Sequence, residues 1–499
     1  MTNKTSKIGQ DLLVNILSTL PPKSLMRFKC VAKWWHALIN DPRFVDKHLS
    51  HSLLDDQSTR VLLKRMLVPS TEDPNGDKFQ SVFSVLTFDN VIVDDDDGGV
   101  HKCSTLSGIE DVNIPLSMSL EIGDDQSFHV IGHCDGIICL ARPNSTKVLL
   151  WNPAIQEFRV LPSETYSPDW FDEASFRDPH PWWLSMPYMP LTDRFDDVLG
   201  LGYDPKSKDY KVVKIGFSGS ELHGGTEHLI IHPPKVVVYT LGTNSWREIE
   251  PYSLETETTF LWPETFQVYF KGMCYWIGSE QQKEFADSYD VTYPEQEKIR
   301  RVIVLFDMSR EVFHDILLPH EMVEFNNFEG IGIEMRLKVW NESIALFRLN
   351  RNTFEDGDTP PFEMWLMDDD SGGGPKNAGG VWTKHFAAKI PSFSMSGLPL
   401  YSTLAMWKSD EVLTVEGNGG LPMWKSDEVL TVEENGGTVC YNFRTKKLKN
   451  LPIQSAVRIN PIFPPQPYYL PLCKANHSPI VYVKSMVSVT VGNNKYMCT

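Results

Sequence analysis

The sequence predicts two domains, a small all-α module at residues 8–50 and an all-β domain at residues 60–490. Leucine and isoleucine recur at three- and four-residue steps near the N-terminus, which is the spacing of one face of a helix. After residue 60, short runs of Val, Ile, Leu and aromatic residues alternate with clusters of Gly, Pro, Asn and Asp, a pattern typical of strands joined by turns. A degenerate repeat in these runs indicates that the strands form several copies of one unit.

The helical module is expected to contain two main helices. The first follows an apolar stripe at 12–20 and ends at Pro21-Pro22, because proline lacks the backbone donor and clashes with the preceding turn. The second is predicted over 25–39, with Ser24 as its cap. Asp41-Pro42 stops this helix, and a shorter helical turn follows.

Helices this short lie at the lower size limit for a free-standing core, so part of their apolar surface needs additional cover. One interpretation is a helical hairpin packed on the domain that follows. The order of the segments DLLxxIL, LPPKSLxRFxCV, LIxDPxF and HL also resembles the plant F-box motif. In that family the helices dock on a Skp-type adaptor, which joins them to a cullin ubiquitin ligase. The resemblance implies an adaptor contact through apolar residues of the module, namely Leu12, Leu13, Ile16, Leu17, Leu20, Pro22, Leu25, Phe28, Val31 and Trp35.

The repeat in the second domain is an apolar strand ending in an aromatic residue, a polar turn, and a second apolar residue seven positions later. A fifth, looser copy carries a Gly-rich insertion, Ser371–Gly380, between its two tryptophans. The paired residues are Trp151 and Phe158, Tyr239 and Trp246, Phe306 and Phe313, Tyr441 and Leu448, and Trp365 and Trp382. Such a hairpin cannot bury its face alone, so the copies must stack. Four-stranded sheets that stack radially form a β-propeller, so the repeat predicts a β-propeller-like domain. A β-sandwich is the alternative.

Longer motifs extend the resemblance over almost the whole chain. The segments HCDGIIC at 133–139, WNPAIQEFRVLP at 151–162, LGYDPKSKDYKVVK at 201–214 and KGMCYW at 271–276 look like the F-box-associated domain of plant F-box proteins. In combination they look most like the S-locus F-box family, including its S-locus F-box brother group. That family acts in pollen self-incompatibility, so the resemblance implies a receptor that directs ubiquitination of non-self S-RNases. An F-box receptor for an unrelated plant substrate and an inactive paralogue are the alternatives.

The net charge and the spacing of the cysteines limit the possible partners and the cellular compartment of the protein. A formal net charge of −18 argues against nucleic acid as the main partner and favours a basic protein, although solubility alone also explains an acidic chain. The eight cysteines include no Cys-x-x-Cys, which fits a reducing cytoplasm or nucleus. No apolar run reaches the ~18 residues that a membrane span needs, so no membrane partner is expected.

No catalytic constellation is found in the sequence. It lacks a phosphate-binding glycine loop, a His-Glu-x-x-His motif and a Gly-x-Ser-x-Gly motif. We therefore expect no catalytic residue, no metal and no cofactor, and interpret the chain as a non-catalytic receptor subunit. A propeller enzyme or a carbohydrate-binding module is the alternative from another functional class.

Substrate recognition is expected in loops between strands, because loops vary at little cost to a scaffold. The candidate segments are Glu164–Asp193, Ser218–Pro234 and Glu280–Lys298, which are long and polar or aromatic. The first has the aromatic content of a binding hot spot, although its tryptophans can equally pack against the propeller wall. These tryptophans are Trp170, Trp182 and Trp183.

A tandem copy interrupts the last part of the chain. The segment MWKSDEVLTVE at 406–416 recurs unchanged at 423–433, which indicates a recent internal duplication. Each copy is predicted to form a strand followed by a Gly-rich turn. One is expected within a blade and the other as a loop or edge hairpin, since surface insertions cost little.

Overall fold

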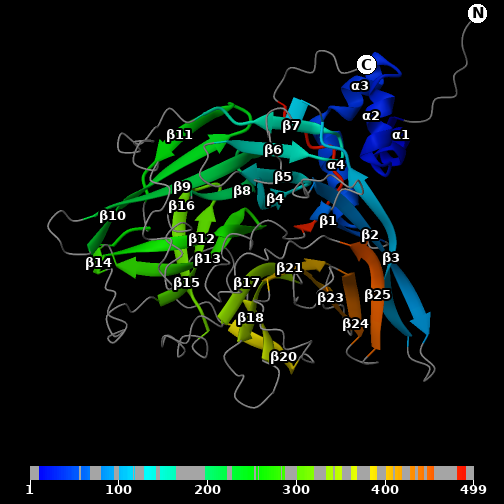
Figure 1. The fold of residues 1–499 in the computed structure, drawn as a ribbon. Coiled ribbons are helices and arrows are strands. Elements are labelled where there is room, and N and C mark those ends of the chain that lie inside the picture. The colour runs from blue at the N-terminus through cyan, green and yellow to red at the C-terminus, as the bar shows by residue number, and fades with distance from the viewer. Residues whose placement is uncertain are drawn as a thin grey trace, which may run out of the picture.

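Helices occupy the first part of the chain and strands follow (Figure 1). A computed structural model of the protein describes residues 10–55, 58–67, 80–94, 100–115, 117–118, 128–141, 147–163, 197–221, 228–251, 254–256, 258–282, 284–286, 300–319, 333–340, 343–350, 361–367, 382–389, 401–407, 411–417, 428–432, 437–442, 447–454 and 480–490.

Four short helices form the N-terminal module: α1 (Gln10–Ser18), α2 (Pro22–Lys29), α3 (Lys33–Ile39) and α4 (Pro42–Leu53). The predicted single helix over 25–39 is wrong, because Ala32 is extended (φ −156°) and separates α2 from α3. Ser24 is not the cap of α2, which begins at Pro22, where the missing N–H of proline costs nothing. Asp41 caps α4 by accepting a bond from the Arg43 N–H at 2.9 Å, so the predicted short turn is a 12-residue helix.

The strands of the second domain are β1 (Ser58–Leu67), β2 (Gln80–Asp94), β3 (Val100–Val112), β4 (His129–Cys134), β5 (Ile137–Ala141), β6 (Val148–Asn152), β7 (Glu157–Val160), β8 (Val198–Asp204), β9 (Asp209–Glu221), β10 (His228–Thr240), β11 (Ser245–Ile249), β12 (Thr259–Phe270), β13 (Met273–Gln282), β14 (Glu284–Ala286), β15 (Arg300–Asp307), β16 (Val312–Leu317), β17 (Ile333–Trp340), β18 (Ser343–Asn350), β19 (Pro361–Met367), β20 (Trp382–Lys389), β21 (Tyr401–Trp407), β22 (Glu411–Gly417), β23 (Glu428–Val432), β24 (Gly437–Asn442), β25 (Lys447–Gln454) and β26 (Ile480–Val481).

Among the described residues, five sheets each contain a path of four antiparallel strands. Their orders are β26-β1-β2-β3, β4-β5-β6-β7, β8-β9-β10-β11, β12-β13-β15-β16 and β17-β18-β19-β20, while β14 pairs with β10. The strands β21–β22 and β23–β24–β25 form two smaller sheets. The first strands of successive sheets contact one another around the centre, and β26 closes the ring by pairing with β1. This radial arrangement confirms the β-propeller and excludes the β-sandwich.

The predicted aromatic pairs lie on the last two strands of their sheets. In four units the paired residues are directly opposite each other: Trp151 with Phe158, Tyr239 with Trp246, Phe306 with Phe313, and Tyr441 with Leu448. In the fifth, looser unit the two tryptophans lie on the paired strands β19 and β20 but not opposite each other, since Lys384 faces Trp365 and Trp382 faces Met367. Burial of the first residue of each pair is confirmed for Trp151, Tyr239, Phe306 and Trp365, while the side chain of Tyr441 lies outside the described part.

Tight turns join the first strand to the second, and the third to the fourth, in several sheets. Where the turn has two residues, both have positive φ: 50° and 85° at Asp135 and Gly136, and 46° and 83° at Lys271 and Gly272. Such turns match the twist of a hairpin. At Gly136 a side chain is excluded twice, because a Cβ there would also lie 2.4 Å from the carbonyl oxygen of Val483.

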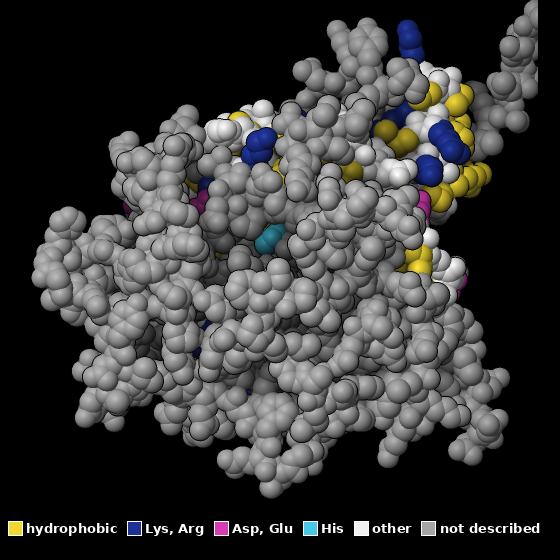
Figure 2. Space-filling model, viewed as in Figure 1, with side chains coloured by type: hydrophobic (Ala, Val, Ile, Leu, Met, Phe, Trp, Pro, Cys, Tyr) yellow, Lys and Arg dark blue, Asp and Glu magenta, His cyan; other side chains and the backbone are white. Residues whose placement is uncertain are grey.

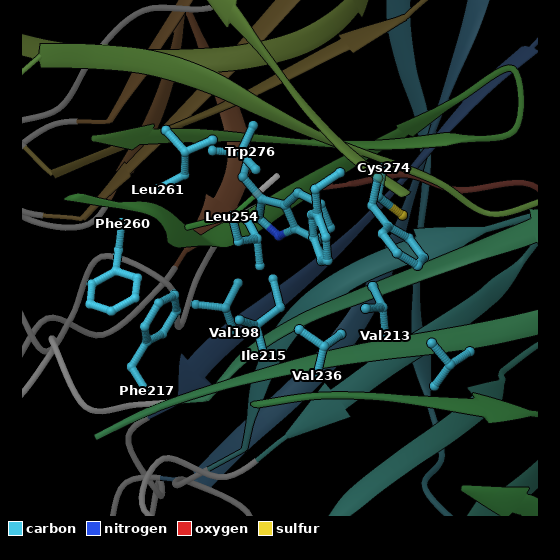
Figure 3. Close-up of a cluster of buried hydrophobic side chains, with 14 of the residues drawn as sticks. Val198, Val213, Ile215, Phe217, Val236, Leu254, Phe260, Leu261, Cys274 and Trp276 are labelled. Atoms are coloured by element: carbon cyan, nitrogen blue, oxygen red, sulfur yellow. The ribbon is translucent and has the colours of Figure 1, made fainter. Parts of the chain in front are cut away.

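Apolar side chains from neighbouring sheets pack into continuous cores. The cluster in Figure 3 gathers Val198, Ile215 and Trp276 from strands of two sheets. The buried Trp276 indole donates to the carbonyl oxygen of Leu199 at 3.2 Å and so ties β13 to β8. The blades are therefore joined by packing and by specific hydrogen bonds.

The tandem copies and the last described segment complete the β domain. Both tandem copies form strands, as predicted: the first contributes β22, paired with β21, and the second contributes β23, paired with β24. The apolar run at 480–489 has the composition of a strand, but β26 ends at Val481. The chain leaves the sheet there and packs Met486 among the helices.

Candidate functional site

An exposed set of apolar side chains on the helices is the clearest candidate site. Leu12 and Ile16 on α1 expose 55% and 49% of their surface, Val31 after α2 exposes 68%, and Trp34 on α3 exposes 54%. Figure 2 shows hydrophobic side chains gathered where Figure 1 places the helices. Single exposed apolar residues are ordinary, but a group of this size on one small module is typical of an interaction surface. Leu53 and Leu54 at the end of α4 are also exposed. We call Leu12, Ile16, Val31 and Trp34, which lie between the start of α1 and the end of α3, the exposed apolar residues.

The residues predicted to contact an adaptor differ in burial. Leu12, Ile16 and Val31 are exposed, Leu13, Leu20, Phe28 and Trp35 are half-buried, and Leu17, Pro22 and Leu25 are buried. Leu17 and Leu25 belong to the core of the module itself. In this conformation the exposed and half-buried residues can meet a partner directly, whereas a charge at Leu17 would disturb the fold first.

Sequence reasoning missed Trp34. This residue lies one position before the predicted Trp35, off the apolar stripe, and its ring packs edge-on against Trp35 with centroids 5.2 Å apart. Trp35 in turn meets the ring of Phe28 at 5.0 Å. A large aromatic residue on the polar side of an amphipathic helix is the signal that could have found it.

The helical module is seated on the propeller through its own core. Ile155, from the turn between β6 and β7, and Met486, after β26, are buried in the same cluster as Leu17. Val45 and Leu49 of α4 pack against a core cluster of the propeller. The prediction that the module needs additional cover is therefore confirmed, and the propeller supplies part of that cover.

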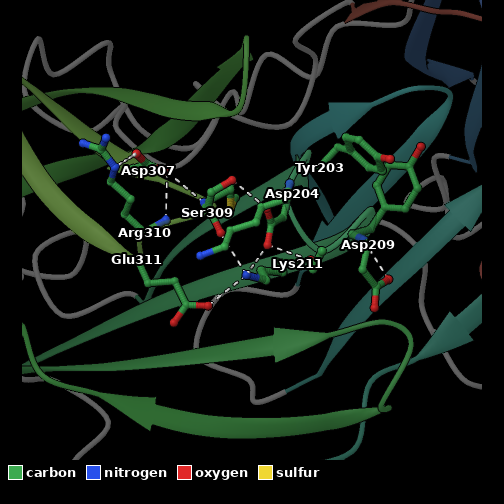
Figure 4. A network of polar contacts seen from close by, with 12 residues as sticks. Tyr203, Asp204, Asp209, Lys211, Asp307, Ser309, Arg310 and Glu311 are labelled. Carbon is green, nitrogen blue, oxygen red and sulfur yellow. Dashed lines mark hydrogen bonds and ion pairs between the residues drawn. The ribbon is translucent and has the colours of Figure 1, made fainter. Parts of the chain in front are cut away.

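A buried polar network joins hairpins of two neighbouring sheets (Figure 4). The Lys211 ammonium on β9 lies 2.6 Å from Asp204 and 2.9 Å from Glu311, and it donates to the carbonyl oxygen of Met308 at 2.9 Å. Ser309 donates to Asp204 at 2.6 Å. Burial favours a higher pKa for Asp204, but the hydrogen bonds from Lys211 and the neighbouring serines outweigh it and hold this pKa well below its usual value. Because each of these charges has a partner, the network cross-links the two hairpins.

A second titratable pair lies where α4 faces the turn between β4 and β5. The Tyr210 hydroxyl donates to Asp135 at 3.0 Å. Burial raises the pKa of Asp135, and the nearby carboxylate of Asp46 on α4 adds to that effect. Burial and the charge of Asp135 also raise the pKa of Tyr210 far above its usual range. The hydrogen bond holds the β4–β5 turn against β9, beside the seat of the helical module.

The three candidate recognition segments share one edge of the propeller at the level of the strand ends. The first segment lies between β7 and β8, and the third runs from the end of β13 to the start of β15. The second was predicted as a loop over Ser218–Pro234, but its two ends belong to the paired strands β9 and β10. Each of these strands has a tight turn at its other end, and one such turn carries Ile155 into the helical module. The segments therefore leave and rejoin the sheets at the edge away from the helices. Their predicted contact residues, Trp170, Trp182 and Trp183, lie outside the described residues.

Other kinds of site find little support in the described part of the chain. Within it, no group of three or more His, Cys, Asp or Glu side chains is arranged to hold a metal ion. Burial raises the pKa of the Cys139 thiol to about 12, which keeps this sulfur protonated and poorly nucleophilic. None of the described helices has the length and apolar character to cross a bilayer.

Both parts of the chain match known families. The family described as "F-box-like" matches residues 10–51, and the family described as "F-box associated beta propeller domain" matches residues 107–489. The chain belongs to the F-box associated β-propeller family. The exposed apolar residues thus lie within the F-box-like match, and most of the described strands lie within the F-box associated β-propeller match.

Similar curated proteins come from Arabidopsis thaliana. The putative F-box protein At3g21120 is 24% identical over 63% of this chain and 66% of its own length. The F-box/kelch-repeat protein At3g17530 is 24% identical over 69% of this chain and 67% of its own length, and the F-box protein CPR1 is 24% identical over 79% and 77%. The chain thus spans about two thirds of the length of the first two relatives. Among solved structures, the β-propeller domain of Cps50 (Swd1) from Myceliophteria thermophila covers 78% of this chain and 89% of its own at 8% identity and a TM-score of 0.28, which carries no argument.

Proposed function

We propose that this chain is the substrate-receptor subunit of a Skp–cullin–F-box ubiquitin ligase. The helical module binds a Skp-type adaptor, the adaptor links it to the cullin scaffold, and the propeller holds the substrate. Catalysis then belongs to other subunits, and this chain acts by raising the concentration of the substrate near the ubiquitin donor. Its place of action is the cytoplasm or the nucleus.

The exposed apolar residues carry this proposal. Leu12, Ile16, Val31 and Trp34 sit on a module that matches the F-box-like family, and the propeller leaves them uncovered. Burial of such side chains by a partner stabilises a complex by roughly 25 cal/mol for each Å² of apolar surface. The opposite position of the candidate recognition segments supports simultaneous binding of adaptor and substrate, since the two partners then approach from different sides.

The test uses the substitutions Ile16→Asp and Val31→Asp in the full chain. A charge in an apolar contact costs several kcal/mol, so calorimetry with a purified Skp-type adaptor should show binding weakened by about 100-fold or more. Ile109→Asp is the matched control, because Ile109 is also exposed (37%) but lies on β3 of the propeller. Unchanged affinity in both helical variants, with wild-type circular dichroism, contradicts the proposal.

We also propose a specific class of substrate, which the sequence alone supports. The S-locus F-box resemblance and the net charge of −18 support a basic S-RNase as the substrate in pollen self-incompatibility, since opposite charges accelerate encounter. Affinity purification of the tagged chain from pollen should then recover the adaptor, the cullin and an S-RNase together. Recovery of the adaptor and cullin without any S-RNase would leave a receptor for a different plant substrate.

A further inference from the structure

The helical module and the propeller share one hydrophobic core. Ile155 is 5% exposed and Met486 is 2% exposed, and both are packed with Leu17, Leu25 and other core residues of the helices. Ile155 comes from a propeller turn and Met486 from the last described segment of the chain. Two distant parts of the propeller domain therefore complete the core of a module too small to form a full one.

A single buried side chain locks these two segments together. Asn152, which is fully buried, donates through its Nδ2 to the Val487 carbonyl oxygen at 2.8 Å and to the Ser485 carbonyl oxygen at 3.2 Å. Its Oδ1 accepts from the Ala154 N–H at 3.0 Å and so shapes the turn that presents Ile155. The turn and the C-terminal segment thus form one seat, and neither can shift without breaking buried hydrogen bonds.

The module has a second attachment to the propeller. Val45 and Leu49 of α4 pack against the propeller cluster that contains Cys134 and Leu201, and Val45 also packs against the cluster that contains Ile155 and Met486. Asp55, just after α4, pairs with Arg60 at 3.5 Å on the first propeller strand. Rotation of the module on the propeller would expose apolar side chains at both of these adjoining contacts, so together they oppose hinge motion.

We propose that Ile155 and Met486 are positioning residues that fix the orientation of the helical module on the propeller. They touch neither adaptor nor substrate in the proposed function, on which this inference rests; they set the angle between the two binding sides. A fixed angle matters because a tethered reaction gains from proximity only when its geometry allows both partners to meet.

The experiment measures how widely one distance between the helical module and the propeller is distributed. Nitroxides on ketone-bearing amino acids at the exposed Thr19 of the module and Thr243 of the propeller leave the native cysteines untouched. Pulsed electron paramagnetic resonance should give one narrow distribution of the distance between the two nitroxides in the parent chain. The double variant Ile155→Ser/Met486→Ser should at least double the width of that distribution, while Ile155→Val should keep it narrow.

Matched variants separate an effect on the orientation of the helical module from a general loss of protein stability. Ile303→Ser makes the same chemical change at a fully buried isoleucine within the propeller, and it should lower the melting temperature without widening the distribution. If the double serine variant does not fold, the Ile155→Ala and Met486→Ala single variants replace it. Distributions as narrow as that of the parent in the Ile155 and Met486 variants, or an equal widening in Ile303→Ser, would overturn the proposal.

A measurement of adaptor affinity distinguishes failure of the positioning role from failure of the proposed receptor function. The positioning variants leave the exposed apolar residues untouched, so adaptor binding should stay within about threefold of the parent chain. Absence of adaptor binding by the parent chain removes the receptor function, whatever the distances show. Adaptor binding together with unchanged distances removes only the positioning role.

Discussion

Buried aromatic residues are the positions that the sequence defines most sharply. A seven-residue spacing predicts that Trp151 and Phe158 share a face of one hairpin, because a short polar turn brings them into register. The seven-residue spacing does not apply at Trp365, where Lys384 lies opposite and brings its ammonium to 5.2 Å from the ring. The Gly-rich insertion between the two tryptophans is visible in the sequence, but the pairing register across it and the bulge in the strands are not.

Trp151 provides a test of burial at one residue. Trp151→Ala should lower the free energy of unfolding by about 3–5 kcal/mol, since a fully buried ring leaves a cavity. Its indole nitrogen has no hydrogen-bond partner among the described residues, so Trp151→Phe removes an unsatisfied donor and should cost only about 1–2 kcal/mol. Urea denaturation followed by circular dichroism measures both losses, and equal losses would contradict the burial argument.

Two glycines in strands offer a second comparison at this scale. A Cβ at Gly200 would lie 2.5 Å from the Trp276 ring and 3.0 Å from the Gln267 oxygen, whereas a Cβ at Gly108 meets nothing within 4 Å. Gly200→Ala should therefore destabilise the protein by about 1–3 kcal/mol through overpacking. Gly108→Ala should change stability by less than about 0.5 kcal/mol in the same thermal or urea measurement. A reversed order of the two variants would show that β8 and β13 pack differently.

At the scale of helices and hairpins, the sequence predicts that an element forms more readily than it predicts which residues that element packs against. The apolar stripe of the module predicts helices correctly, but a stripe does not separate Leu17, which faces inward, from Ile16, which faces outward. The helix break at Ala32 carries no proline or glycine signal. The seat formed by Ile155 and Met486 was not predictable either, because it joins residues far apart in the sequence through tertiary packing alone.

The hairpins joined by Lys211 give a test at the scale of elements. Lys211→Met leaves Asp204 and Glu311 without their shared cation, and removal of one partner from a buried ion pair costs about 3–5 kcal/mol. Because the pKa of Asp204 is lowered in the folded state, the stability from this pair is present above the ordinary aspartate pKa near 4 and is lost as the pH falls below it. Lys235→Met removes a more exposed pair with Glu248 and should cost less than about 1 kcal/mol. Equal losses in denaturation at pH 7 would contradict the cross-link.

For the whole molecule, the sequence predicts the class of fold and the order of its domains, and structure adds how the domains meet. The propeller closes by pairing β26 with β1, so the two ends of the β domain lie side by side beside the helices (Figure 1). The segment after β26 then reaches into the core of the module. One continuous body results, with the exposed apolar residues at one side and the ends of the candidate recognition segments at the other.

Hydrogen exchange with and without a purified Skp-type adaptor tests the central claim most directly. Adaptor binding should slow amide exchange in α1 and in the segment from Val31 through α3, where the exposed apolar residues lie. Exchange in the propeller strands should stay unchanged, and Ile16→Asp should abolish the slowing. Protection confined to the propeller, or no protection at any adaptor concentration, would contradict the assignment of the helical module as the adaptor site.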